Sequence, residues 1–161
     1  MTIILPNYEI NEQTLALKPA FHHQYSTIAL EGNQTLFIQQ TPLQLIQQAA
    51  LKGGSDYNGR RRSITYLTGV KKKIPIPLYP QKNIYAFPTH SPHHQDCYWI
   101  FFHQVDSIQK LPTPKNSIYS TKVIFKNGQE LLLKESIYTI EKQMYRTWLC
   151  VKALEGETIK L

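Results

Sequence analysis

The sequence predicts an α+β fold, dominated by β-sheet, in a single domain over residues 1–161. Most apolar residues alternate with polar ones in short runs, which is the period of β-strands. Only two segments, about 41–53 and 139–154, show the spacing of amphipathic helices. A length of 161 residues with 42% hydrophobic residues is sufficient for one hydrophobic core.

The expected strands are short and are separated by residues that favour turns. Glycine and asparagine at Gly32-Asn33 and at Asn127-Gly128 supply the positive φ angles that tight hairpin turns need. The segments with β-like patterns are Ser26–Leu30, Thr35–Gln39, Asn83–Phe87, Tyr98–Val105, Ser117–Lys126 and Gln129–Lys134.

The first helix has a clear start. Thr41 is its N-cap, Pro42 suits the first helical position, and Gln44 completes a capping box. Gly53 is expected to end this helix in the left-handed conformation. In the second helix Arg146 has two candidate partners, Glu141 and DNA, and the sequence leaves both open.

The positive charge of the chain is concentrated between Lys52 and Lys73. This stretch of 22 residues holds seven basic residues and one acid, Asp56, so it carries +6 of the total net charge of +7. Such a concentration attracts a polyanion, and nucleic acid is the commonest polyanion in a cell. The basic residues are Lys52, Arg60, Arg61, Arg62, Lys71, Lys72 and Lys73.

Within this stretch, residues 55–62 are expected to form a loop with an Asn58-Gly59 turn, and residues 64–70 a strand. The proline-rich residues 71–82 are expected to be a stiff, extended connector. A straight strand separates the arginine and lysine triplets by roughly 25 Å. Because one turn of B-DNA is about 34 Å, both triplets can contact one duplex.

The candidate DNA-binding residues divide by chemistry. Arginine is planar and weakly hydrated, so residues 60–62 suit a narrow minor groove. Lysine is a mobile point charge, so residues 71–73 suit phosphate contacts. The predicted site is Lys52, Ser55, Tyr57, Asn58, Gly59, Arg60, Arg61, Arg62, Lys71, Lys72 and Lys73.

An ordered set of short motifs is similar to the ComK family of competence transcription factors of Gram-positive bacteria. The set covers about residues 8 to 150, in the order and at the spacing of the family. The motifs are PLQLI (42–46), GSDYNGR (54–60), NIYAFPT (83–89), CYWI (97–100), FKNG (125–128) and QMYRT (143–147).

The resemblance implies a transcriptional activator that binds promoter duplex DNA at paired A-tract/T-tract boxes from the minor groove. It implies dimers that pair into tetramers on DNA, with RNA polymerase as a candidate further partner. Tyr57, Gly59 and Arg60 match positions of the family motif, and Arg61 stands where the family tends to be basic. Longer members continue into a tail associated with oligomerisation and adaptor-directed proteolysis. This chain stops at Leu161, so we do not extend the functions of that tail to it.

A cluster of histidines with a cysteine could be drawn as a zinc site. His90, His93, His94 and Cys97 have suitable ligand types. A structural zinc site usually pairs two separated ligand clusters, however, and exposed histidines are common in polar loops. We expect no metal, and we expect Cys97 to be a packed residue rather than a nucleophile.

Other patterns argue against an enzyme. The acidic residues are scattered, without the carboxylate cluster that a magnesium-dependent nuclease needs. No P-loop or dinucleotide-binding fingerprint is present, and we expect no cofactor. No secretory signal or membrane span is recognisable, so we expect a cytoplasmic protein associated with the bacterial nucleoid.

Two alternatives to duplex binding stay open. The chain could be a shortened ComK-like protein-interaction module that modulates a full-length activator. It could also bind single strands, with the aromatic run Tyr98–Phe102 as a stacking platform, although such runs more often form the core of a sheet.

Overall fold

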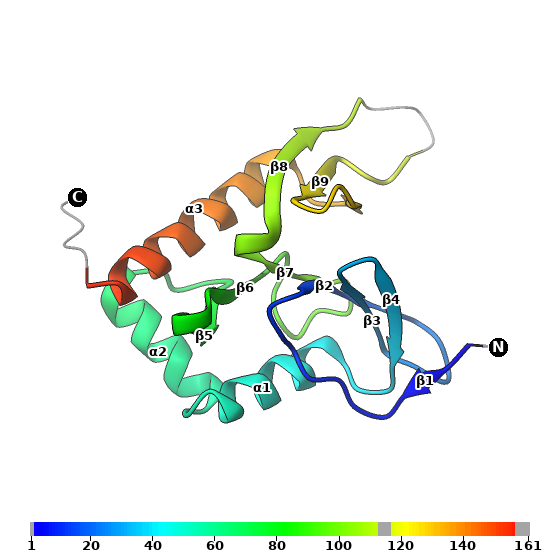
Figure 1. The fold of residues 1–161 in the computed structure, drawn as a ribbon. Coiled ribbons are helices and arrows are strands. Elements are labelled where there is room, and N and C mark those ends of the chain that lie inside the picture. The colour runs from blue at the N-terminus through cyan, green and yellow to red at the C-terminus, as the bar shows by residue number, and fades with distance from the viewer. Residues whose placement is uncertain (1, 113–116, 157–161) are drawn as a thin grey trace.

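The computed structural model describes residues 2–112 and 117–156. The described residues form three α-helices and ten strands in two sheets, which confirms the predicted sheet-dominated α+β fold (Figure 1). None of the helices described is both long enough and apolar enough to cross a membrane.

The larger sheet has seven strands in the order β1-β4-β3-β2-β7-β6-β5. Its pairs are antiparallel except β1 with β4, which is parallel. Pro77 lies in β5, an edge strand, where its missing N–H group costs no ladder hydrogen bond. The strands are β1 (Ile4–Leu5), β2 (Thr14–Pro19), β3 (Thr27–Glu31), β4 (Gln34–Ile38), β5 (Ile76–Tyr79), β6 (Ile84–Pro88) and β7 (Trp99–Phe101).

The smaller sheet is antiparallel, with the order β10-β9-β8. The predicted hairpin at Asn127-Gly128 is confirmed, because β9 and β10 pair on either side of it and Gly128 has a φ of 90°. The predicted strand 98–105 is interrupted by a single 3-10 turn at Phe102–Gln104, after which the chain enters the second sheet. The strands are β8 (Val105–Lys110), β9 (Thr121–Phe125) and β10 (Glu130–Leu133).

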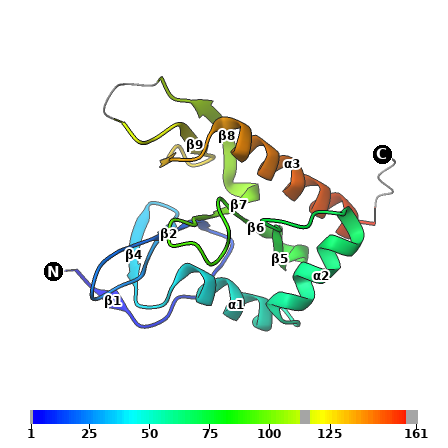
Figure 2. The same ribbon diagram turned by 180° about the vertical axis from the view of Figure 1, so that it is seen from behind.

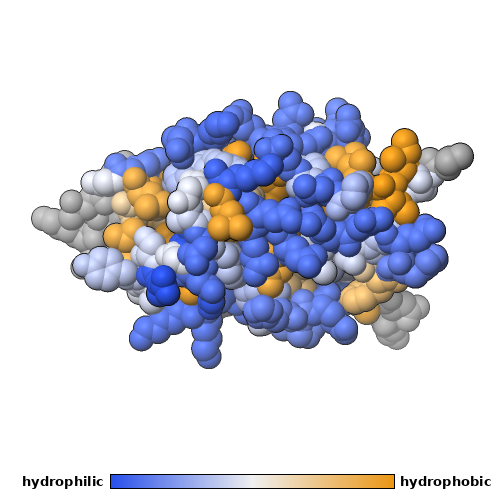
Figure 3. Space-filling model, turned by 90° about the horizontal axis from the view of Figure 1, so that it is seen from below, coloured by the Kyte–Doolittle hydropathy of each residue, from blue (hydrophilic) through white to orange (hydrophobic). Residues whose placement is uncertain are grey.

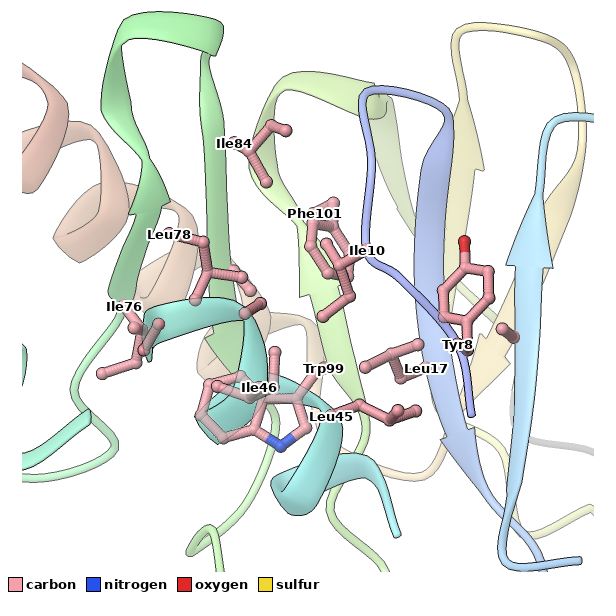
Figure 4. Packing of buried hydrophobic residues seen from close by; sticks show 14 of the residues in the cluster. Tyr8, Ile10, Leu17, Leu45, Ile46, Ile76, Leu78, Ile84, Trp99 and Phe101 are labelled. Carbon is pink, nitrogen blue, oxygen red and sulfur yellow. The ribbon is translucent and has the colours of Figure 1, made fainter. Parts of the chain in front are cut away.

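The large sheet is buried on both faces. On one face Trp99, Leu17 and Leu78 pack against Leu45 and Ile46 of α1 (Pro42–Lys52) (Figure 4). The other face contributes to a second cluster with the small sheet and α3 (Ile137–Leu154). Alternation along β7 sends Trp99 and Phe101 to the first cluster and Ile100 to the second.

Both predicted helices are confirmed, with small differences at their ends. Thr41 and Gln44 form the predicted capping box at the start of α1. The prediction for Gly53 is wrong, since its φ is −77° and Gly54 instead takes a φ of 110°. A Cβ atom at residue 53 would collide with the Leu78 carbonyl and the Arg60 guanidinium, so close packing explains this glycine.

The predictions of a loop at 55–62 and a strand at 64–70 are wrong, because residues Tyr57–Thr68 form a third helix, α2. Asp56 is its N-cap and accepts a hydrogen bond of 2.7 Å from the Gly59 N–H, so Asn58-Gly59 lies in a helical turn. Gly69 ends the helix with a φ of 82°. Residues 71–82 are extended only in part, because Pro80–Lys82 forms a 3-10 turn.

Candidate nucleic-acid interface

The outer face of α2 carries a stripe of polar and basic side chains. Its inner side buries Tyr57, Arg60 and Ile64, at the spacing of a helix face. The outward residues recur at intervals of three and four, and together with two residues of the following connector they line a surface hollow of about 650 Å³. The lining residues are Asn58, Arg61, Arg62, Thr65, Tyr66, Lys71 and Ile74.

The α2 face combines an exposed aromatic side chain with an arginine that is held against a second aromatic ring. The Tyr66 side chain is 89% exposed. The Arg61 guanidinium lies 5.7 Å from the ring centre of Tyr57, in a cation–π contact, and Arg61 Nη1 lies 3.5 Å from Asn58 Oδ1. Figures 1 and 2 show α2 beside the C-terminal end of α3, at the end of the molecule opposite the N-terminus. The molecular surface seen from below in the Figure 1 view is mainly hydrophilic (Figure 3).

Arg60 has a structural role that its place in the basic stretch did not predict. It is 8% exposed and donates hydrogen bonds to three backbone carbonyls. The acceptors are Ala50 at 2.8 Å, Ser55 at 3.4 Å and Pro77. Burial lowers the pKa of this guanidinium, yet arginine starts so high that it stays charged. Arg60 therefore joins α1, α2 and β5 and is unavailable to a DNA groove in this conformation.

The lysine connector, residues 69–75, is held from two sides. Thr65 Oγ1 of α2 donates to the Val70 carbonyl at 2.7 Å. From α3, Gln143 Nε2 donates to the Lys73 carbonyl at 2.9 Å and Arg146 Nη1 to the Lys72 carbonyl at 3.3 Å. Arg146 thus contacts the lysine connector, and the candidate partner Glu141 is not used.

The structure brings together only part of the predicted site. Asn58, Arg61, Arg62 and Lys71 line one hollow, and Lys72 is exposed close by in the chain. The helix also shortens the predicted 25 Å separation, since six residues from Arg62 to Thr68 rise only about 9 Å.

Other predicted residues lie apart from this hollow. Lys52 pairs with Glu9 at 3.2 Å and lines a different depression with Tyr79 and Lys82. Ser55 is exposed. Tyr57 is the first residue of α2 and is buried on its inner side, and the Gly59 N–H donates to the N-cap Asp56 in the first turn. Lys73 is half-buried and lies near the carboxyl group of Glu135. Burial raises the pKa of Glu135, and the positive charge of Lys73 partly opposes that rise.

Sequence reasoning missed the roles that four residues have in this region. Thr65 and Tyr66 belong to the outer stripe, and a helical reading of residues 58–66 would have found them. Gln143 and Arg146 come from α3, some 70 residues away from the lysines that they contact. Only their tertiary position reveals that role.

The histidine loop lies near Lys73 of the lysine connector, because burial, His94 and the positive charge of Lys73 together lower the pKa of His90. His90 and His94 stack with ring centres 3.8 Å apart, and Cys97 is buried with a 3% exposed fraction. Within residues 2–112 and 117–156, no group of three or more His, Cys, Asp or Glu side chains is arranged to hold a metal ion. In the aromatic run Tyr98–Phe102, the residues up to Phe101 are buried in the core and only Phe102 is partly exposed, so the run offers no stacking platform.

Both cysteines are expected to be unreactive in the folded protein. Burial raises the pKa of Cys97 to about 11 and that of Cys150 to about 12. Below these values the thiols stay protonated, and at pH 8 the thiolate of Cys97 is about 100-fold rarer than at the ordinary pKa of 9. We expect a thiol reagent at pH 8 to modify neither cysteine until denaturant is added. Rapid modification of the native protein would contradict this burial.

A basic helix face exposed on a sheet-dominated α+β domain is the kind of surface that nucleic-acid-binding proteins use, so the chain is a candidate for that class. The model of the ComK protein family matches residues 5–157, and the chain therefore belongs to the ComK family. It is 30% identical over 150 residues to the competence transcription factor of Bacillus subtilis (strain 168), an alignment that covers 92% of this chain and 76% of that relative. No solved structure matches the chain. These findings confirm the resemblance seen in the motifs and make the chain a homologue of a transcription factor, a class of protein that is not enzymatic.

Proposed function

We propose that this chain is a competence transcription factor that activates promoters by binding duplex DNA at paired A-tract/T-tract boxes. The observation that carries the proposal is the exposed basic stripe of α2 beside the lysine connector. Four of its positive charges, on Arg61, Arg62, Lys71 and Lys72, are at least partly exposed. If each of these charges neutralises one phosphate, the logarithm of the affinity should fall with the logarithm of the salt concentration. The size of this salt slope should be about 3 to 4 per protomer.

We further propose that Arg61 and Arg62 read the minor groove of the A-tracts. A minor groove about 6 Å wide does not admit a helix, so α2 would lie across it and extend arginine side chains inward. Narrow A-tract grooves have an enhanced negative potential that favours such arginines. Selectivity would then come from groove shape more than from contacts to base edges.

Inosine–cytosine pairs test the groove directly. They resemble A·T pairs in the minor groove and G·C pairs in the major groove, because inosine lacks the 2-amino group of guanine. We expect duplexes with A·T boxes and with I·C boxes to bind tightly and G·C boxes weakly, as measured by fluorescence anisotropy. Tight binding to A·T boxes alone would assign the readout to the major groove, where α2 itself fits. Equal binding to all three, or to single strands, would contradict the proposal.

Paired boxes suit a protein with paired subunits. We propose that the chain binds its sites as a homodimer, that dimers pair on DNA, and that the bound activator contacts RNA polymerase at the nucleoid. Sedimentation of the protein with one box and with two boxes tests the pairing of subunits and of dimers. A single protomer on the two-box duplex would contradict it.

A specific feature of α3 favours a second candidate, a protein-interaction module of the ComK type. Tyr138, Tyr145 and Trp148 recur at helical spacing and are 80%, 53% and 42% exposed. The rings of Tyr145 and Trp148 stack with centres 6.1 Å apart. Exposed aromatic groups of this kind mark protein contact surfaces. If the purified protein does not bind duplex at low salt, this candidate replaces the first.

A further inference from the structure

Gln143 is a polar side chain buried between α3 and the lysine connector. It is 1% exposed, and its amide nitrogen donates to the carbonyls of Lys73 at 2.9 Å and Pro88 at 2.7 Å. Its amide oxygen accepts from Arg146 Nη1 at 3.0 Å. Both amide hydrogens and the amide oxygen are therefore engaged, which fixes the side chain in one orientation.

The backbone that Gln143 holds is in an unusual conformation. Lys73 has a φ of 50°, in the left-handed region that residues other than glycine rarely adopt. Such a conformation persists where the surroundings enforce it. Here the enforcement comes from Gln143 and Arg146 on one side, while Thr65 holds the Val70 carbonyl on the other.

We propose that Gln143 and Arg146 are positioning residues, which fix the lysine connector so that Lys71 and Lys72 form one preorganised surface with Arg61 and Arg62. This proposal rests on the proposed function and deepens it. A preorganised surface does not have to order its backbone on binding, so more of the contact energy appears as affinity. Without these two residues, Lys71 and Lys72 would still be present, but their backbone would no longer be fixed relative to α2.

Gln143→Leu is the most direct test, because glutamine 143 is uncharged and buried and cannot itself neutralise a phosphate. We expect it to weaken binding to the A·T duplex five- to twentyfold and to lower the salt slope by about 1. In the background of Lys71→Ala and Lys72→Ala, the effect of Gln143→Leu should largely disappear, since it acts through those side chains. Losses that add independently would overturn the proposal.

Thr121→Val separates positioning from general destabilisation. Thr121 is fully buried and donates one hydrogen bond, to the Glu135 carbonyl at 2.7 Å, in the smaller sheet. We expect both variants to lower Tm, but only Gln143→Leu to change the salt slope. Should Gln143→Leu fail to fold, Gln143→Asn, which is also uncharged and too short to keep all three contacts, provides the same test. An unchanged slope in a folded variant would contradict positioning.

A spin label tests the same contact without DNA. Because Cys97 and Cys150 are buried, a thiol-specific label will modify only Lys72→Cys. We expect the label to be more mobile in the variant that also carries Gln143→Leu, and equal mobility would overturn the proposal. If the wild type does not bind duplex, the proposed function fails and the DNA role with it. Steep duplex binding with an unchanged slope in Gln143→Leu overturns the positioning role alone.

Discussion

Arg60→Ala is expected to destabilise the protein by about 3 kcal/mol and to lower Tm by about 10 °C. The substitution removes the donor for three backbone carbonyls, one at the end of α1, one in the α1–α2 loop and one in β5. The Ala50 carbonyl keeps backbone hydrogen bonds from Gly53 and Ser55, whereas the Pro77 carbonyl loses a buried, charged donor. Urea and thermal unfolding of the purified variants measure the effect.

Arg62→Ala is the matched control for Arg60→Ala. It removes the same charge from the same helix, but the Arg62 side chain is exposed. We expect its free energy of unfolding to stay within about 0.5 kcal/mol of the wild type. Equal stability of the two variants would show that Arg60 does not join α1, α2 and β5 as described.

Replacing Arg61 and Arg62 together with alanine is expected to produce the largest loss of DNA binding. We expect a 10- to 100-fold weaker affinity for the A·T duplex and a salt slope smaller by about 2, because two phosphate or groove contacts are removed. Affinity for the G·C duplex should fall less, since the arginines are the proposed readers of groove shape. Anisotropy titrations at several salt concentrations provide all three quantities.

The pair Lys52→Ala and Lys82→Ala controls for net charge in that experiment. It also removes two positive charges, but these lysines line a different depression from the hollow of α2. We expect this pair to retain most of the affinity and slope of the wild type. Equal losses in both double variants would mean that only the total charge of the protein matters.

The sequence predicted the hairpin strands within residues 27–38 and 121–133 and the first helix, because their signals are local. The capping box at Thr41 and the Asn127-Gly128 turn each depend on residues within four positions of one another. The same kind of signal was present for α2, with Asp56 as N-cap and Gly69 at its end. The alternation of Ile64, Tyr66, Thr68 and Val70 suggested a strand instead. The structure explains the error, since Tyr66 is almost fully exposed and follows the outer face of a helix.

The candidate site was predictable in composition but not in arrangement. Charge concentration identified Arg61, Arg62 and Lys71, which line one hollow. Composition cannot distinguish Arg60 from its neighbours, because its burial depends on where the carbonyls of Ala50 and Pro77 lie in space. The contacts of Gln143 and Arg146 are equally non-local, and they became visible only when α3 was placed beside the connector.

The most direct test of the central claim, that the α2 face contacts duplex DNA, is site-specific crosslinking. A thiol-specific photo-crosslinker on Asn58→Cys sits on the proposed surface and leaves every positive charge in place. The buried Cys97 and Cys150 should not react with it. The same reagent on Gln34→Cys in β4 marks an exposed position away from α2. We predict crosslinks to the A·T duplex from position 58 and none from position 34. Crosslinks from position 34, or equal yields from both, would contradict the assignment of the DNA surface to α2.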